Sequence, residues 1–483
     1  MRSQHPRSAT RRSVVRALVA APFILRATSP AHALDGLPAL PEQDVVLLRP
    51  GDPRYEQSQP VYNLRTSLRP SIRALCLTPT GLRRLIDLAR ERQIPFALRS
   101  GGHSFEGLSQ SQSLAIDVRP LNATRFDSAS QALNVGAGAS LGEIYRAAAK
   151  VGMCFPAGSC PTVGSAGHIQ GGGYGLLSRA LGLASDSMIG ADIVDAQGQL
   201  KTITKETDPN LHWALSGGGG GTFGAVAGFQ LRLHPIGCVL TFTQGFVLPL
   251  TQAIQVVAAW QSWAPNAPTE ITSILKIQSP SSGRVSLRLA GQSIGQPAQL
   301  LAELQRFAQA AGQTISANII GGSFFEAMDR FSGGWNYESK FSKGKSDFVF
   351  KPLTNPAIDT LLRGVLSLPP YNMIVICDSY GGAIRNKRND ESAFAFRDAL
   401  YCMQYYSSWQ NPAQTAQRLT QIRSVYDAMR PHVPGFAYVN YCDLDIKDWQ
   451  RAYWSSNAQR LRQIKTATDP KNLFRHAQSV TPI

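Results

Sequence analysis

The sequence predicts an α+β fold made of two domains. Between Ser71 and Pro235, short apolar runs alternate with glycine-rich loops and helical stretches. After Cys238 glycine becomes rarer, and longer amphipathic segments appear together with alternating strands. The chain has 483 residues, of which 43% are hydrophobic and 17% charged, so it is neither a disordered acidic tail nor a membrane bundle. At about 150 residues per domain, this length allows two or three domains.

Several short strands and two helices are predicted before residue 238. Apolar residues at helical spacing predict helices over 82–92 and 141–150. Residues 189–194 and 199–204 are predicted to form a hairpin around Ala196-Gln197-Gly198. Apolar runs of strand length indicate further strands at 74–77, 96–98, 114–118, 132–135 and 225–233.

Longer elements are predicted after residue 238. The amphipathic segments 252–263 and 298–311 predict helices, and residues 284–290, 373–380 and 399–406 predict strands. The C-terminal end is predicted to contain a strand at 436–441, a helix at 459–465 and a turn at Asp469-Pro470.

Residues 1–33 have the features of an export signal. They contain six arginines and no Lys, Asp or Glu, followed by a short apolar run and the small-residue site Ala31-His32-Ala33. The adjacent Arg11 and Arg12 resemble a twin-arginine signal, and the alternative is a disordered basic tail. We therefore expect an exported protein, periplasmic or secreted. No other stretch reaches about 18 apolar residues, so no membrane span is expected.

The seven cysteines do not follow a metal-binding pattern. No C-x-x-C pair is present, so we expect neither a structural zinc site nor any other bound metal. The odd number leaves at least one sulfur unpaired, and the pairing of the rest stays open. The cysteines are Cys76, Cys154, Cys160, Cys238, Cys377, Cys402 and Cys442.

Three glycine-rich loops suggest one large phosphate-bearing ligand. The densest motif spans residues 160–175, where glycines allow backbone N–H groups to approach an anion. Apolar residues such as Val163 and Ile169 interrupt it, which argues against a flexible linker. The other two loops are 99–103 and 216–224, and together the three would hold the ligand from several sides.

His103 and Cys160 are nucleophilic side chains within these loops. A lone histidine is more often structural, and a lone cysteine is more often a small buried apolar residue. Both nevertheless lie in glycine-rich ligand loops, where nothing else requires a nucleophilic side chain. We therefore assign both to the predicted site.

The motifs together resemble the berberine-bridge-enzyme-like flavoprotein oxidases of the vanillyl-alcohol-oxidase superfamily. The resemblance rests on the loop 99–107, the run 160–175, Leu211-His212-Trp213-Ala214-Leu215 and Tyr438-Val439-Asn440-Tyr441. It implies that the chain after residues 1–33 is a two-domain α+β flavoprotein. Its parts are an FAD-binding domain of p-cresol-methylhydroxylase type at 34–238, a substrate domain with an antiparallel sheet flanked by helices at 239–434, and a segment at 435–483 that returns to the FAD domain.

The same resemblance implies FAD held by two covalent bonds. His103 would bond to the 8α-methyl carbon of the flavin and Cys160 to ring carbon 6. The pyrophosphate is expected on residues 100–104, the adenine near Asp186 and 193–194, and the isoalloxazine near Asn457 and Tyr441. The resemblance assigns further residues to FAD. Together with the individual members of the ranges 100–104 and 193–194, they are Arg99, Ser100, Gly101, Gly102, Ser104, Thr162, Val163, Gly164, Gly167, His168, Gly172, Tyr174, Gly175, Ile193 and Val194.

Removing hydride from an alcohol carbon requires a base that takes the hydroxyl proton. A tyrosine can act as this base only as tyrosinate, so nearby positive charge or hydrogen-bond donors must lower its pKa from about 10. The resemblance favours Tyr441, because the family's Asn-Tyr pair lies near the flavin. Tyr438 is the second candidate, and a packing role for either ring is the alternative.

We expect the strands 373–380 and 399–406 of the second domain to form the wall of the site that faces the flavin. Alternation places Asp378 and Tyr380 on one face of the first strand, and Cys402 and Gln404 on one face of the second. Relatives carry a base or an assisting residue on these strands. Cysteine at position 402 excludes the lysine-assisted variant, and the second base stays open among Asp378, Tyr380 and Gln404.

These inferences predict an enzyme that oxidises an alcohol or a sugar hydroxyl. Val163 stands where the family's oxidases carry valine, which favours molecular oxygen as acceptor and hydrogen peroxide as product. The alternatives are a flavin dehydrogenase with another acceptor, or a non-catalytic binding protein. The net charge of +16 includes six arginines in residues 1–33; no nucleic-acid motif accompanies it, so no nucleic-acid partner is expected. Substrate identity and oligomeric state stay open.

Overall fold

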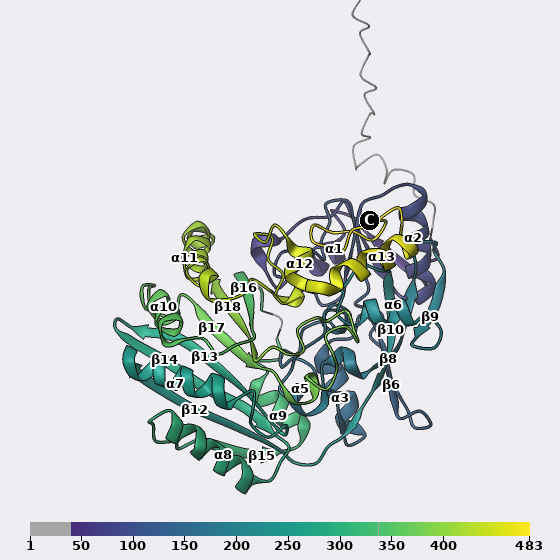
Figure 1. The fold of residues 1–483 in the computed structure, drawn as a ribbon. Coiled ribbons are helices and arrows are strands. Elements are labelled where there is room, and N and C mark those ends of the chain that lie inside the picture. Colours follow the sequence, from purple (N-terminus) through teal and green to yellow (C-terminus); the bar gives the residue numbers. More distant parts are fainter. Residues whose placement is uncertain (1–39, 337) are drawn as a thin grey trace, which may run out of the picture.

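The computed structural model describes residues 40–336 and 338–483, so the predicted export signal at 1–33 lies outside the described residues. Two lobes lie side by side, one built on four- and five-stranded sheets and the other on a seven-stranded sheet (Figure 1). The C-terminal helices pack on the first lobe (Figure 1). This is the predicted α+β class.

A four-stranded mixed sheet begins the first lobe. Its order is β1 (Val45–Leu48), β2 (Ile72–Cys76), β4 (Leu114–Asp117) and β3 (Phe96–Arg99). β4 pairs in parallel with both β2 and β3. The connection between β2 and β3 is α2 (Pro79–Glu91), which Thr78 caps and which buries Leu82, Leu85 and Ile86. The predicted helix and strands are confirmed here.

A five-stranded antiparallel sheet completes the first lobe. Its order is β5 (Thr124–Asp127), β6 (Ala132–Gly136), β10 (Ala225–Arg232), β8 (Met188–Val194) and β9 (Leu200–Thr204). The predicted β8–β9 hairpin is confirmed. After β6 the chain enters α3 (Leu141–Lys150), which begins with a capping box between Ser140 and Glu143.

Short elements connect these sheets. The helices are α1 (Pro53–Ser58), α4 (Ser165–Gln170), α5 (Ser178–Leu181) and α6 (Pro209–Leu215), and β7 (Met153–Cys154) pairs with β11 (His234–Pro235). α4 lies within the glycine-rich loop 160–175, and α6 directly precedes the glycine-rich loop 216–224.

The second lobe is a seven-stranded antiparallel sheet. Its order is β15 (Asn318–Gly322), β12 (Val239–Pro249), β14 (Arg284–Ser293), β13 (Ile271–Ser281), β17 (Ile374–Ser379), β18 (Tyr401–Trp409) and β16 (Phe341–Val349). The two strands predicted for the site wall, β17 and β18, are neighbours.

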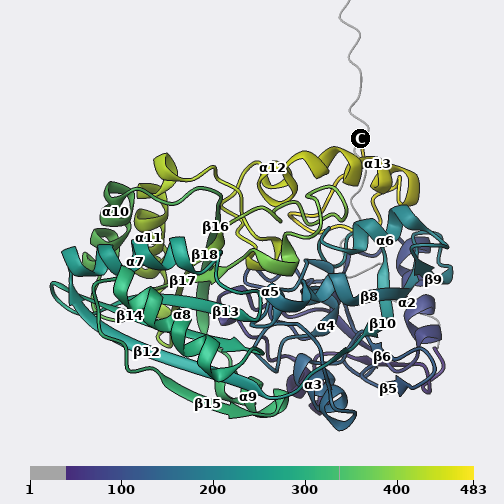
Figure 2. The ribbon, with the colours of Figure 1, turned by 60° about the horizontal axis from the view of Figure 1, so that its bottom comes forward.

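Helices cover one face of this sheet. They are α7 (Leu250–Trp263), α8 (Pro297–Ala310), α10 (Asn355–Leu366) and α11 (Thr415–Ala428), while α9 (Phe324–Phe331) contacts β12 and β15. Figure 2 shows α7 and α8 lying across the sheet. Leu275, Cys377 and Met403 pack against these helices. Because side chains alternate along a strand, Lys276, Asp378 and Gln404 point to the opposite face.

The C-terminal segment corrects one prediction. Residues 436–441 do not form a strand; Val439–Tyr441 is a 3-10 helix. The backbone N–H of Ala437 donates to Ala452 of α12 (Trp449–Trp454), and that of Tyr438 donates to the Ser346 hydroxyl. These bonds to separate elements replace a strand ladder and turn the chain. The predicted final helix is confirmed as α13 (Ala458–Thr468).

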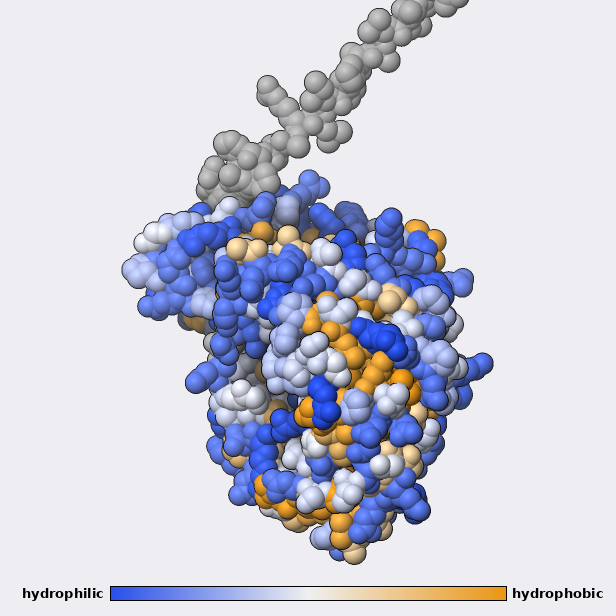
Figure 3. Space-filling model, turned by 90° about the vertical axis from the view of Figure 1, so that its left-hand side faces the viewer, coloured by the Kyte–Doolittle hydropathy of each residue, from blue (hydrophilic) through white to orange (hydrophobic). Residues whose placement is uncertain are grey.

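The outer surface is mixed in character. Figure 3 shows the side that lies at the left in Figure 1, where apolar side chains gather between hydrophilic ones. Large apolar residues of the second lobe that stay exposed include Val247, Leu301 and Ile320. Among the described helices, none has the length and apolar character needed to cross a bilayer.

Candidate functional site

A cavity of about 630 Å³ lies between the two lobes. This volume is within the ordinary range for small-molecule and cofactor sites, about 300–1,000 Å³. Residues from both lobes and from the C-terminal segment line it. The predicted residues among them are Ser100, Gly101, Gly102, His103, Ser104, Cys160, Thr162, Val163, Gly164, Gly167, His168, Tyr174, Gly175, Asp378, Gln404, Tyr438 and Tyr441.

Two glycine loops pack against each other at the cavity floor. A Cβ on Gly101 would lie 2.2 Å from the backbone nitrogen of Gly164, and a Cβ on Gly164 would lie 2.1 Å from that of Gly101. Only glycine permits this approach of the two backbones. Around Gly167 and Gly221, by contrast, a Cβ would meet nothing within 4 Å, so their backbones stand open in the cavity lining.

Buried polar atoms in the lining also fit a polar ligand. Gln170 Oε1 and Thr222 Oγ1 have no hydrogen-bond partner within residues 40–336 and 338–483. Both residues line the cavity, and Thr222 is fully buried. Because buried polar atoms are normally paired, a bound polar group would satisfy them. The glycine loops and these atoms together fit FAD, whose phosphates and ring system offer both acceptors and donors.

His103 and Cys160 meet at Thr162. The Thr162 hydroxyl lies 3.0 Å from His103 Nε2 and 3.5 Å from Cys160 Sγ. Tyr62 stacks on the imidazole with 4.4 Å between ring centroids. Burial lowers the pKa of His103 to about 4, and a hydrogen bond from the imidazole to the backbone oxygen of Thr162 opposes this in part. The imidazole is therefore neutral at physiological pH, and a ring nitrogen can act as a nucleophile.

The inner face of the seven-stranded sheet forms the opposite wall. Asp378 on β17 lies opposite Ile274 on β13, and the next row joins Lys276, Ile376 and Gln404. All five line the cavity. The predicted alternation therefore holds for Asp378 and Gln404. Cys402, two residues from Gln404, is buried and does not line the cavity.

Tyr441 donates a hydrogen bond of 3.2 Å to Asp378 Oδ2. Burial raises the pKa of Asp378 to about 7, and the contacts with Tyr441 and Lys276 oppose this. Burial and the nearby Asp378 carboxylate both raise the pKa of Tyr441 well above its ordinary value. The expectation of a tyrosinate is therefore wrong for this arrangement, because the neighbour of the phenol is an acceptor and not a cation. The structure instead pairs a neutral tyrosine with a titratable carboxylate.

Tyr438, the second tyrosine candidate, is hydrogen-bonded to the glycine-rich loop 160–175. The oxygen of Tyr438 accepts hydrogen bonds from the backbone of Gly173 at 2.9 Å and Tyr174 at 3.2 Å, and from Asn440 Nδ2 at 2.9 Å. Its ring packs edge-on against Tyr441, with centroids 4.9 Å apart. Burial still raises the pKa of Tyr438, although these donors lower it. Tyr438 thus joins the glycine loop to Tyr441.

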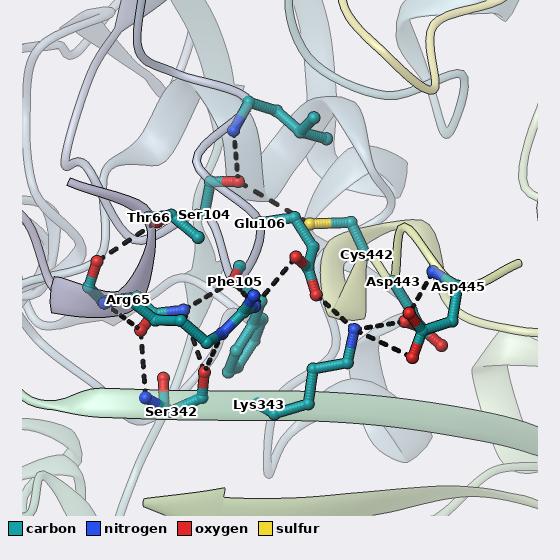
Figure 4. Close-up of polar contacts among 12 residues, drawn as sticks. Arg65, Thr66, Ser104, Phe105, Glu106, Ser342, Lys343, Cys442, Asp443 and Asp445 are labelled. Atoms are coloured by element: carbon teal, nitrogen blue, oxygen red, sulfur yellow. Dashed lines mark hydrogen bonds and ion pairs between the residues drawn. The ribbon is translucent and has the colours of Figure 1, made fainter. Parts of the chain in front are cut away.

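A buried ion network connects the elements that carry His103 and Tyr441 (Figure 4). Lys343 Nζ on β16 lies 2.6 Å from Glu106 Oε1 and also contacts Asp443 Oδ1. Arg65 Nη2 lies 2.8 Å from the second oxygen of Glu106. Burial lowers the pKa of Lys343, but Asp443 and Glu106 together raise it above its ordinary value. Glu106 follows His103 by three residues, and Asp443 follows Tyr441 by two.

Several predicted residues do not line the cavity. The Asp186 carboxylate pairs with Arg397 and Lys387 at 2.8 Å, and its adenine contact stays a prediction. Asn457 Nδ2 donates to the backbone oxygens of Asn389 and Ser392 and does not line the cavity, so its position near the ring system stays a prediction. The others are Arg99, Gly172, Ile193, Val194 and Tyr380.

Four of these five other residues have contacts that explain their positions. Arg99 donates to backbone oxygens of Ser58 and Pro60 and lies beside Asp117. Ile193 and Val194 belong to the core of the five-stranded sheet. Tyr380 stacks on Tyr174 at 5.2 Å between centroids. The three predicted loops contribute residues to the cavity lining, but the sequence pattern could not distinguish residues facing the cavity from their neighbours facing the core.

The structure adds residues that the sequence did not indicate. Tyr62 on the loop before β2 stacks on His103, and Lys276 and Tyr406 extend the sheet wall. No motif surrounds any of them. For Lys276 a signal existed, since it is the one charged residue in the sequence of β13.

Neither a metal cluster nor a disulfide belongs to this site. Within the described residues, no group of three or more His, Cys, Asp or Glu side chains is arranged to hold a metal ion. In the same part of the chain all seven cysteines are free. Cys160 is half-buried, and the Thr162 hydroxyl lies between its sulfur and the imidazole of His103.

Two protein families match this sequence. Residues 70–204 match the family described as FAD binding domain, and residues 437–481 match the family described as Berberine and berberine like. The first match covers the glycine loop of Cys160, and the second covers Tyr438 and Tyr441.

Relatives and solved structures agree with these matches. The chain is 32% identical to the uncharacterized FAD-linked oxidoreductase YgaK of Bacillus subtilis, over 89% of this chain and 96% of the relative. It is also 32% identical to berberine bridge enzyme-like D-1 of Nicotiana tabacum, over 82% of this chain and 80% of that one. Berberine bridge enzyme from Eschscholzia californica superposes with a TM-score of 0.84 at 27% identity, covering 91% of this chain and 97% of the enzyme. Physcomitrella patens BBE-like 1 gives 0.85 at 27% identity, over 94% and 99% of the two chains.

Proposed function

The chain belongs to the berberine bridge enzyme-like family of FAD-linked oxidoreductases, and on this premise we propose that it oxidises an alcohol or a sugar hydroxyl. The observation that carries the proposal is the hydrogen bond between Tyr441 and Asp378 in the lining of the cavity that also holds His103 and Cys160. This pair can accept a hydroxyl proton where a substrate carbon gives up hydride.

The cofactor in this proposal is FAD linked covalently through His103 and Cys160. Both side chains line the cavity, and the imidazole of His103 is neutral, so one of its ring nitrogens carries a lone pair. Tyr62 and Thr162 hold the ring from its face and its edge. When bound, FAD supplies hydride-accepting chemistry, and molecular oxygen as the final acceptor accounts for hydrogen peroxide as second product. Val163 in the cavity lining supports oxygen as acceptor through the family pattern.

The protein's own residues move the proton. The substrate hydroxyl donates its proton to the oxygen of Tyr441, while Tyr441 donates its phenolic proton to Asp378 Oδ2. Tyrosine stays neutral before and after this step, so its high pKa is no obstacle. The carboxylate of Asp378 receives the proton, and its pKa of about 7 matches a base that works near neutral pH.

We also propose that the protein is exported by the signal at residues 1–33. Twin-arginine export carries folded proteins. A protein that attaches its cofactor before leaving the cytoplasm suits this route.

The test combines the cofactor and the reaction in one purified holoenzyme. We expect the denatured protein to remain yellow, with a mass above that of the polypeptide by one FAD. Aerobic turnover of an alcohol should release hydrogen peroxide in equal amount to the product. Flavin that separates freely on denaturation would refute the covalent links, and product without peroxide would identify a dehydrogenase.

Tyr441→Phe tests the proton path. The variant keeps the ring packing but cannot relay the proton, so the rate of flavin reduction should fall by about 10²–10⁴. The matched control is Tyr371→Phe, because Tyr371 is an exposed phenol outside the cavity. A loss smaller than threefold at Tyr441 would assign the proton transfer to another residue.

A further inference from the structure

Two basic side chains on the cavity side of the sheet lie directly beside each other. Lys276 on β13 is paired with Arg288 on β14 in the antiparallel register. Directly paired residues of an antiparallel sheet project from the same face. Lys276 lines the cavity, and Arg288 is exposed next to it. The two cations therefore face the same side as Asp378 and Gln404.

Neither cation is balanced by the protein itself. Within residues 40–336 and 338–483, no hydrogen bond or ion pair joins Lys276 or Arg288 to another side chain. Burial and then Arg288 lower the pKa of Lys276, and Asp378 opposes them only in part. Like charges directly opposite in a sheet are destabilising. The pair thus weakens the unliganded protein, and an anion beside it would remove that repulsion.

We propose that Lys276 and Arg288 bind an anionic group of the substrate, so that the enzyme oxidises an alcohol carrying a carboxylate or a sulfate. This inference rests on the proposed oxidation at Tyr441 and Asp378. A neutral substrate would leave the Lys276 ammonium half-buried and unpaired. An anionic group would instead accept charge-assisted hydrogen bonds from it.

The sheet also limits the size of the substrate. Asp378 lies opposite Ile274, which precedes Lys276 by two residues on β13. Two residues along a strand span roughly 7 Å. The anionic group therefore lies about one sugar or aromatic ring away from the carbon that is oxidised.

The first experiment compares matched substrates with the holoenzyme. Galactose is paired with galacturonate and with galactose 6-sulfate, and 4-methylbenzyl alcohol with 4-(hydroxymethyl)benzoate. We expect kcat/KM to be at least about tenfold higher for an acidic member than for its neutral counterpart, mainly through KM. Preference for the carboxylate or for the sulfate identifies which anion is bound. Equal kcat/KM within every pair would overturn the inference.

Variants then assign the preference to this pair of cations. Lys276→Gln should reduce the ratio of acidic to neutral kcat/KM about tenfold, and Arg288→Gln should reduce it less because Arg288 is exposed. Arg125→Gln removes one positive charge from an exposed site on β5 and should leave the ratio unchanged. If Lys276→Gln shifts the pH dependence of kcat/KM but keeps the ratio of acidic to neutral kcat/KM, the inference is overturned. Lys276 would then act on the pKa of Asp378.

A binding measurement separates this inference from the proposed function. Benzoate, which has no hydroxyl to oxidise, should raise the Tm of the holoenzyme, whereas benzamide should not, and Lys276→Gln should abolish the benzoate shift. If benzoate binds in this way but no alcohol is oxidised, the anion site stands and the proposed function fails. If neutral alcohols are oxidised and benzoate gives no shift, the proposed function stands and the anion site fails.

Without ligand, Lys276→Gln should have a Tm equal to or above that of the unmodified protein, and a fall of several degrees would contradict the repulsion argument.

Discussion

At the scale of single residues, the environment of Asp378 decides how Tyr441 works. A phenol beside a cation becomes an easier proton donor to solvent, whereas a phenol beside a carboxylate keeps its proton and passes it to that carboxylate. Tyr441 is in the second situation. Asp378 is only 4% exposed, and its ionised form is therefore costly to the folded protein. The charge that the reaction requires is thus one that the fold tolerates poorly.

Asp378→Asn should separate the effect of the Asp378 charge on stability from its role in proton transfer. Burial raises the pKa of Asp378 to about 7 from about 3.9 in an unfolded chain, so the folded state holds this proton more tightly. The stability from Asp378 is therefore full below about pH 4, is lost as pH rises to about 7, and stays lost above it. Asparagine resembles the protonated form. We expect Asp378→Asn to unfold at higher urea concentration than the unmodified protein at pH 8, with a smaller difference at pH 4.5.

The activity of the same variant provides the second measurement. Because the carboxylate must be ionised to accept the proton, flavin reduction in the unmodified protein should rise with pH through about 7. Asp378→Asn should be slow at every pH. A variant that is less stable at pH 8, or one that keeps the pH-dependent rise, would contradict the assignment.

At the scale of elements, three separate segments meet at Lys343. β16 supplies the ammonium, the loop after His103 supplies Glu106, and the segment after Tyr441 supplies Asp443 (Figure 4). Each carboxylate is almost fully buried. The loop that carries His103 and the segment that carries Tyr441 are thereby held to one strand. Lys343 is therefore a positioning residue and does not itself line the cavity.

Lys343→Met should reveal this role. It removes the cation that Glu106 and Asp443 share. Breaking a buried ion pair is destabilising by about 3–5 kcal/mol, and we expect a loss near the lower end because Glu106 keeps Arg65 and Asp443 keeps Lys345. Urea unfolding measures the loss, and Lys201→Met is the control because its pair with Asp195 is partly exposed. The control should lose about 1 kcal/mol or less. An equal effect of the two substitutions would mean that Lys343 is not a connecting residue.

At the scale of the whole molecule, Arg179 joins the two lobes. It lies on α5 of the first lobe and donates to five backbone oxygens of the second, those of Pro265, Ala267, Pro268, Ile271 and Tyr380. The side chain is buried, and burial lowers its pKa to about 10. Since the cavity is lined from both lobes, its shape depends on contacts of this kind.

Arg179→Ala should weaken the connection between the lobes. It removes five hydrogen bonds from a charged donor and leaves buried oxygens unpaired, so we expect a loss of about 3 kcal/mol or more. Calorimetry should resolve two unfolding transitions in place of one. Arg363→Ala changes an exposed guanidinium on α10 and should shift stability by about 0.5 kcal/mol or less. A single transition at the original Tm in Arg179→Ala would show that other contacts dominate.

The sequence by itself determined the local structure and the ligand loops. The helices 82–92 and 141–150 and the hairpin at 189–204 follow from spacings of two to four residues, which depend only on near neighbours. The back-to-back packing of Gly101 and Gly164 requires glycine at both positions, so the loops carrying His103 and Cys160 are visible as motifs. Residues 436–441 were predicted wrongly because their hydrogen bonds go to distant elements.

The tertiary structure alone decided which side chains meet. Tyr441 and Asp378 are 63 residues apart, and Lys276 lies beside Arg288 only through the register of two strands. Tyr62 has no motif, yet it stacks on His103. Charge state and reactivity depend on burial and on such neighbours, and both arise when distant segments pack together. For that reason the sequence identified the loops that line the cavity, while the proposed proton path and the proposed anion site required the fold.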